Sequence, residues 1–399
     1  MAANVLNFLD PQYLMGVISA RQDFGLERPK YIGERMFPRQ NFPEQTILWE
    51  RIRRENRLAG VYSAKGKAIP GDDIGFETLF ANVVWIKAAK YLDPDIVQKI
   101  RDPGMVPVYT QGGSAFAVQG IAQRVQSKMQ QYLTFVDDQI AAQEEYFALQ
   151  AMQGSLRWPP LGADGLPIAA PGIMPEWNAQ EKVEVSWPFE STFVQSMYTL
   201  EGVPAKPGLA NRQGTQLGWT DPNANPVFDI EVIADLMMET KGVDIDGATM
   251  FMSRKALSYI AQLENVQRYL RGTNFEGDTP TQAGNPFAVK QQVKSMFGLT
   301  IELYDAKWTY LSGTNADGTE NIQSVRFLPA HRAVLVPRGE KIGVMAQSPH
   351  ETQDGSFTHG KVLHIHRDEK EPHERELSMS NVVFPLLEQP EGIGVFDLF

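Results

Sequence analysis

The stretch "VQSKMQQYLTFVDDQIAAQEEYF", residues 125–147, decides the fold, because it contains neither Gly nor Pro and consists mostly of good helix formers. A break at Thr110-Gln-Gly-Gly-Ser and a terminating Gly154 extend the predicted helix to residues 114–153, with Ser114 as its N-cap. Such a helix is roughly 60 Å long. A compact globule of this chain length would be only about 55 Å across, so the helix predicts a flattened body.

The apolar residues of this helix recur three, four or seven positions apart, which predicts one buried stripe and one polar face. The stripe comprises Val118, Ile121, Val125, Met129, Leu133, Val136, Ile140, Phe147 and Ala151.

Composition excludes several functions. The 399 residues are 43% hydrophobic, enough for real cores and for two or three structural units. The net charge of −11 disfavours nonspecific binding to nucleic acid or to an anionic membrane. The chain has no cysteine, which excludes disulfides, thiolate chemistry and Cys-ligated zinc and fits a cytosolic origin. The amino terminus does not have the pattern of a signal peptide, and no apolar run is long enough to predict a membrane span.

Changes of pattern along the chain predict five regions. Residues 1–46 form an arm, with a possible short helix at 11–18. Residues 47–92 form a long extended hairpin around "AGVYSAKGKAIPGDDIGFETLFANVVWIKAAKYL". Residues 93–226 hold a short helix at 94–100, the long helix, a strand at 182–194 and two Pro-rich stretches. Residues 227–335 alternate helix and strand as a self-sufficient unit, and residues 336–399 are strands that return to the body.

The chain lacks any complete catalytic or metal-binding motif, so we predict no enzymatic activity, no cofactor and no metal site. "DIDG" at 244–247 lacks the remaining ligands of a calcium loop and indicates a helix-to-strand turn. "HEREL" at His373 lacks the second histidine of a zincin. His364 and His366 would share one face of a strand, which a solvated strand explains. A metal-dependent intracellular hydrolase using these three histidines is the alternative from another functional class.

The hairpin supplies the candidate contact residues. Its apolar side chains have no sequence-local partner to cover them, which is typical of an interface. Its basic side chains favour ion pairing with an acidic neighbouring surface. The candidates for intersubunit contact are Arg51, Arg54, Val61, Tyr62, Lys65, Lys67, Ile69, Phe76 and Phe80.

The chain combines a predicted arm, a projecting hairpin, one very long helix and a separate α/β unit, and it has no complete catalytic motif. This organisation is typical of a protein that functions by contacting copies of itself. The chain resembles the lambda-type major capsid proteins, the major capsid protein E family of tailed bacteriophages. Residues 123–154 resemble the family's spine helix, and "VEVSWPF" its following strand. Residues 229–272 resemble the opening of its axial domain, and "FLP…VLVP" within 327–337 a family pattern. The tail "SNVVFPLLEQPEGI" resembles the closing strands.

The resemblance implies an α+β, HK97-like fold with an N-terminal arm, an extended hairpin loop (E-loop, 47–92), a peripheral domain built on spine helix 114–153, and an axial domain at 227–335. It implies self-assembly through hexamers and pentamers into an icosahedral shell, in the virion after assembly in the host cytoplasm. The implied partners are portal and scaffold proteins, with a decoration protein as a further candidate, and the shell encloses DNA without reading its sequence. The alternative phage role is a tail tube or sheath.

Overall fold

The structure is a computed structural model. The residues that it describes are 31–44, 46–52, 76–92, 115–158, 183–186, 194–196, 218–222, 224–226, 229–231, 234, 238, 244–264, 266, 289–291, 293–294, 298–314, 320–339, 341–352, 354–367, 375–388 and 393–398. The short helices predicted at 11–18 and 94–100 and most of the Pro-rich stretches lie outside these residues.

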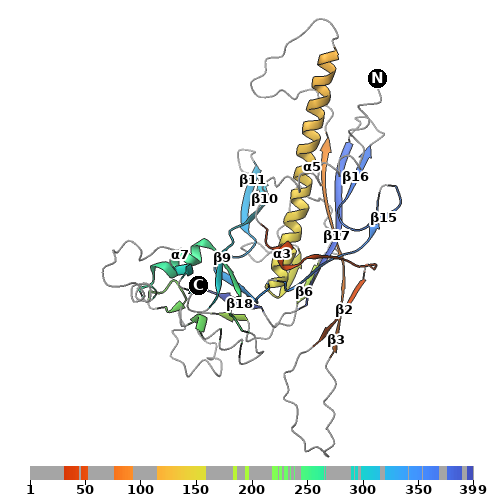
Figure 1. Cartoon of the computed structure of the whole chain (residues 1–399). Coiled ribbons are helices and arrows are strands. Elements are labelled where there is room, and N and C mark those ends of the chain that lie inside the picture. Colours follow the sequence, from red (N-terminus) through yellow and green to blue (C-terminus); the bar gives the residue numbers. More distant parts are fainter. Residues whose placement is uncertain are drawn as a thin grey trace, which may run out of the picture.

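The long predicted helix is present as α5, Ala115–Met152, which is 38 residues and about 57 Å long (Figure 1). It ends where Gly154 takes a positive φ of 87°, a conformation that Gly adopts readily. The stripe residues that the structure describes from Leu133 onward are all buried. None of the described helices is long and apolar enough to cross a bilayer.

The expected polar face of α5 does not persist along the helix. From Glu144 to Leu149 every residue is buried, including the carboxylates Glu144 and Glu145. The prediction of a single buried stripe was therefore wrong for this part of α5. The reason is that the N-terminal segment around Met36 and the second sheet pack on the side that periodicity had assigned to solvent.

The main sheet lies against α5 (Figure 1), and buried residues of the helix and sheet form one core. Its central strand, β17, pairs antiparallel with β13, β16 and β4, and β1 adds in parallel to β13. The strands are β1 (Arg39–Asn41), β4 (Val84–Leu92), β13 (Gly343–Gln347), β16 (Val362–Arg367) and β17 (Arg375–Leu387).

The extended hairpin is shorter in the structure than the predicted region 47–92. Strands β2 (Thr46–Ile52) and β3 (Phe76–Asn82) pair with each other, antiparallel. The last part of the predicted region, β4, instead pairs with β17. Its Ile86 is buried, so this strand belongs to the body.

The second sheet has strand order β7-β18-β12-β8-β9, and helix α7 follows β8 in the chain. Two of its strands, β7 and β18, come from outside the predicted unit 227–335. Within the predicted helix at 254–272, α7 ends at Gln262 and Leu263 has an extended backbone with ψ of 130°. Glu264 and Val266 beyond this break are again helical. The elements are β7 (Val194–Ser196), β8 (Thr249–Met252), α7 (Arg254–Gln262), β9 (Thr300–Leu303), β12 (Arg332–Val336) and β18 (Gly394–Asp397).

Three two-stranded ribbons complete the described strands. The strand predicted at 182–194 is divided into β6 and β7, in different sheets, with Pro188 between them, and Pro is disfavoured inside a strand. The ribbons are β5–β6 (Ser155–Trp158, Val183–Ser186), β10–β11 (Lys307–Thr314, Glu320–Arg326) and β14–β15 (His350–Glu351, Phe357–Thr358). Before β1 lies the short helix α3 (Gly33–Met36).

Candidate functional site: a buried polar seam and exposed contact surfaces

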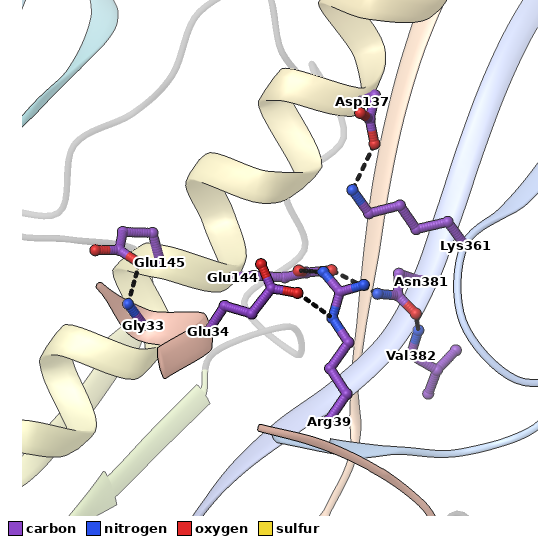
Figure 2. Close-up of polar contacts among 9 residues, drawn as sticks. All are labelled: Gly33, Glu34, Arg39, Asp137, Glu144, Glu145, Lys361, Asn381 and Val382. Carbon is purple, nitrogen blue, oxygen red and sulfur yellow. Dashed lines mark hydrogen bonds and ion pairs between the residues drawn. The ribbon is translucent and has the colours of Figure 1, made fainter. Parts of the chain in front are cut away.

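A buried polar seam joins α5 to the N-terminal segment and the main sheet (Figure 2). We define the seam as Arg39, Asp137, Glu144, Glu145, Lys361 and Asn381. All of these side chains are largely buried except that of Arg39, which is 32% exposed at the edge of the seam. Three of these are carboxylates on α5, and each is held by donors from elements distant in the sequence.

Glu145 receives three hydrogen bonds. The backbone N–H groups of Ile32 and Gly33 donate to its two oxygens at 3.0 and 2.7 Å, and the hydroxyl of Tyr304 donates at 2.6 Å. Burial raises the pKa of the Glu145 carboxyl, although these three hydrogen bonds oppose the shift. This side chain therefore ties α3 and the end of β9 to the long helix.

Glu144 pairs with the first residue of β1. The Arg39 guanidinium lies 2.8 Å from its carboxylate, and the Asn381 amide of β17 donates to the other oxygen at 2.5 Å. Burial alone would lower the pKa of Arg39, but the carboxylates of Glu144 and Glu34 raise it overall. The cation is thus held where the N-terminal segment joins the main sheet.

The third carboxylate, Asp137, forms a buried ion pair with Lys361, just before β16, at 2.5 Å. Buried pairs of this kind gain little net stability, but removing one partner leaves a costly unpaired charge. We therefore interpret the seam as structural: it fixes the position of α5 relative to the N-terminal segment and the main sheet. Within the described ranges, no group of three or more His, Asp or Glu side chains could hold a metal ion.

The predicted contact residues fall mostly outside the described ranges. Arg51 lies on β2 opposite Glu77, and Phe80 lies on β3 opposite Leu48; Phe76 begins β3. The remaining candidates, which are Arg54, Val61, Tyr62, Lys65, Lys67 and Ile69, lie outside the described residues. Their part in intersubunit contact stays a prediction.

The rejected metal motifs have ordinary structural roles where the structure describes them. In "DIDG" the Asp244 side chain accepts a hydrogen bond from the backbone N–H of Asp246 at 2.9 Å, and Gly247 has a φ of 76°, which makes the predicted turn before β8. On β16, His364 lies 3.5 Å from the Ser380 hydroxyl. His373 lies outside the described residues.

Several exposed aromatic residues escaped the sequence prediction. Phe357 on β15 is 70% exposed, Phe135 on α5 is 47% exposed, and Trp85 on β4 is 45% exposed. Lys90 lies 5.4 Å above the Phe135 ring. Exposed aromatics on ordered elements are typical of interfaces. Periodicity could have found Phe135, which lies off the apolar stripe, but the exposed face of β4 depends on its pairing with β17.

Comparison with protein families gives one match along almost the whole chain. The sequence model of the family Phage major capsid protein E matches residues 11–192 and 211–394. No curated protein sequence matches significantly.

Solved structures are similar to this chain at low sequence identity. A prophage protein of E. coli CFT073 assigned as a capsid protein matches with a TM-score of 0.54 and 14% identity, over 98% of this chain and 99% of that chain. A phage-related protein of Bordetella bronchiseptica RB50 gives 0.46 and 14%, over 97% and 96%. The capsid of cyanophage P-SCSP1u gives 0.42 and 11%, over 93% and 89%. Of these three, the first has a TM-score high enough to support the fold.

Proposed function

Because the chain belongs to the phage major capsid protein E family, we propose that its copies assemble through hexamers and pentamers into the icosahedral shell around the genome of a tailed phage. The structural, capsid-forming role and the HK97-like fold follow from the family itself. The observation that carries the assignment is the match over both 11–192 and 211–394, in chain order.

We assign α5 as the spine helix of a peripheral domain that also contains the main sheet. Its length supports this role, since 38 residues reach about 57 Å. We assign the second sheet and α7 to the axial domain. The core shared by α5, β8 and β12 would hold the two domains as one flat subunit.

The β2–β3 hairpin is the proposed strap to a neighbouring subunit. In the described residues, its strands pair with each other and with no other strand, so the hairpin adds nothing to either large sheet. The candidates from Arg51 to Phe80 would place basic and apolar side chains on the neighbour. An acidic chain, with 48 Asp and Glu against 37 Lys and Arg, offers those basic groups suitable partners.

A shell that encloses a genome also needs other proteins for its assembly, for DNA entry and for stabilisation. We propose portal and scaffold proteins, and a decoration protein on the outer surface. The shell would assemble in the host cytoplasm and remain in the virion. The net charge of −11 per subunit would disfavour tight binding of DNA to the inner surface of the shell.

The test is electron microscopy of the purified full chain after concentration. Closed, uniform shells are expected. Tubes would favour the alternative of a tail tube or sheath, and a chain that stays monomeric at all concentrations would contradict self-assembly.

A further inference from the structure

Two short links connect the β2–β3 hairpin to the body of the subunit. Residues 42–45 join the end of β1 to the start of β2, and Val83 alone joins the end of β3 to the start of β4. Both β1 and β4 belong to the main sheet, and Figure 1 shows strands β2 and β3 extending away from it. Because the links are short, the contacts that they make set the direction in which the hairpin projects.

Side chains at the two ends of the β14–β15 ribbon hold the link that enters the hairpin. The Ser348 hydroxyl, shortly before β14, donates to the backbone carbonyl of Glu44 at 2.6 Å. His359, directly after β15, donates through Nε2 to the backbone carbonyl of Phe42 at 3.1 Å, since a carbonyl can only accept. Between these two carbonyls, the ring of Pro43 restricts its own φ and keeps Phe42 out of the helical region. The entry link therefore has little conformational freedom while both hydrogen bonds are present.

The same ribbon contacts the strand that leaves the hairpin. The ring of His350, on β14, is buried and lies edge-on to the ring of Trp85, with the two centroids 5.6 Å apart. Trp85 lies close to Val83 in the chain and pairs with Val382 of the central strand β17. The ribbon and the main sheet thus hold β4 at the point where the hairpin ends.

We propose that Ser348, His350 and His359 form a clamp that sets the direction of the β2–β3 hairpin, and that they act as positioning residues for the intersubunit strap. The inference rests on the proposed function, which makes the hairpin a strap, and it assigns a role to residues outside the hairpin. A strap reaches a neighbouring copy only when it projects in the right direction. Loss of the clamp leaves a fraction of subunits competent, and the apparent affinity falls by that fraction.

Double electron–electron resonance measures the direction of the hairpin in the unassembled full chain. The chain has no cysteine, so Glu50→Cys on β2 and Gln131→Cys on α5 carry the only spin labels. We expect one narrow distribution of distances between the two labels. Ser348→Ala/His359→Leu should lose this narrow distribution, while circular dichroism and cooperative melting are retained.

Two control variants separate positioning from a general loss of packing. His359→Gln keeps an N–H donor near the position of Nε2, so in the Ser348→Ala background it should give a narrower distribution than His359→Leu does. Ser258→Ala/His331→Leu removes the same two types of side chain on α7 and just before β12, and it should leave the distribution unchanged.

Assembly measures the consequence of the clamp. Ser348→Ala/His359→Leu should raise the critical subunit concentration about tenfold, the loss expected if about one tenth of the hairpins keep the competent direction. An unchanged distance distribution in this variant would overturn the inference, as would equal effects of Gln and Leu at position 359. A broadened distribution with an unchanged critical concentration would overturn it too. An unsubstituted chain that never forms shells would instead refute the proposed function, and the resonance measurement would still decide whether the clamp sets the direction of the hairpin.

Discussion

Gly33→Ala offers a sharp test of the polar seam. Gly33 begins α3, and its N–H donates to Glu145 at 2.7 Å. A Cβ at this position would lie 2.5 Å from a Glu145 carboxylate oxygen and 2.8 Å from the Cβ of Ala148. Neither neighbour can move freely, because both side chains belong to the buried part of α5. The N-terminal segment would have to lift from the helix.

The expected cost is the sum of three effects. Overpacking costs about 1–3 kcal/mol. Weakening a hydrogen bond to the buried Glu145 carboxyl leaves a buried polar group less well satisfied and costs about 1–3 kcal/mol. The lower entropy of the unfolded chain after Gly→Ala offsets about 0.4–1 kcal/mol. The net destabilisation should be about 1–5.5 kcal/mol.

Denaturant unfolding measures this cost from the shift in midpoint at an unchanged m-value. Amide hydrogen exchange should show faster exchange at Ile32 and Gly33. Glu34→Ala is the control, because that side chain is 72% exposed and the substitution should stay within about 0.5 kcal/mol. If Gly33→Ala were as stable as the unsubstituted chain, the tight packing of α3 against α5 would be refuted.

Three further predictions concern α5, the buried Asp229 and the hairpin. The Asp229 carboxylate accepts a hydrogen bond from the indole N–H of Trp219 at 2.9 Å. Ile140→Asp places an unpaired carboxylate at a fully buried position of α5 and should cost on the order of 3–5 kcal/mol by chemical unfolding. Burial raises the pKa of Asp229 from 3.8 to about 7, so the folded state binds its proton more tightly. Stability due to this group is therefore full below about pH 4 and lost as pH rises to 7. Asp229→Asn should thus match the unsubstituted chain at pH 4 and exceed it at pH 8 by up to about 4 kcal/mol in thermal or chemical melts. Replacing residues 60–80 by a short Gly/Ser linker should leave the circular dichroism and melting of the monomer nearly unchanged but abolish shells in electron micrographs.

Each of these has a clear contrary outcome. A cost for Ile140→Asp no larger than for the same change at exposed Gln131 would show that this side of α5 faces solvent. A pH-independent difference for Asp229→Asn would mean that Asp229 is not held in its protonated form near neutral pH. Unfolding of the monomer after replacement of 60–80 would place that segment in a core, and persistent shells would show that it is not a strap.

The elements that sequence predicted well depend on local patterns. An uninterrupted run of helix formers with a break at each end predicts α5 to within a residue or two. The short apolar run at 248–253 predicts β8, and two extended runs around Asp317-Gly318 predict β10 and β11. In each case the signal lies within the element or its turn.

The features that could not be predicted from the sequence depend on contacts between segments that are distant along the chain. The pairing of β4 with β17, and of β18 with β12, joins residues far apart in the chain, and apolar alternation does not specify a partner. The seam was missed for the same reason. Glu144 and Glu145 look like surface residues of a helix until Arg39 and the Gly33 N–H are brought against them. The strap candidates remain predictions from composition, because most of them lie outside the described residues.

The most direct test of the central claim is a cryo-electron microscopy reconstruction of particles formed by the full chain. We predict a closed icosahedral shell of hexamers and pentamers, with each β2–β3 hairpin lying over a neighbouring copy and α5 running across the flat subunit. A helical tube, or a closed particle in which every hairpin folds back on its own subunit, would contradict the account.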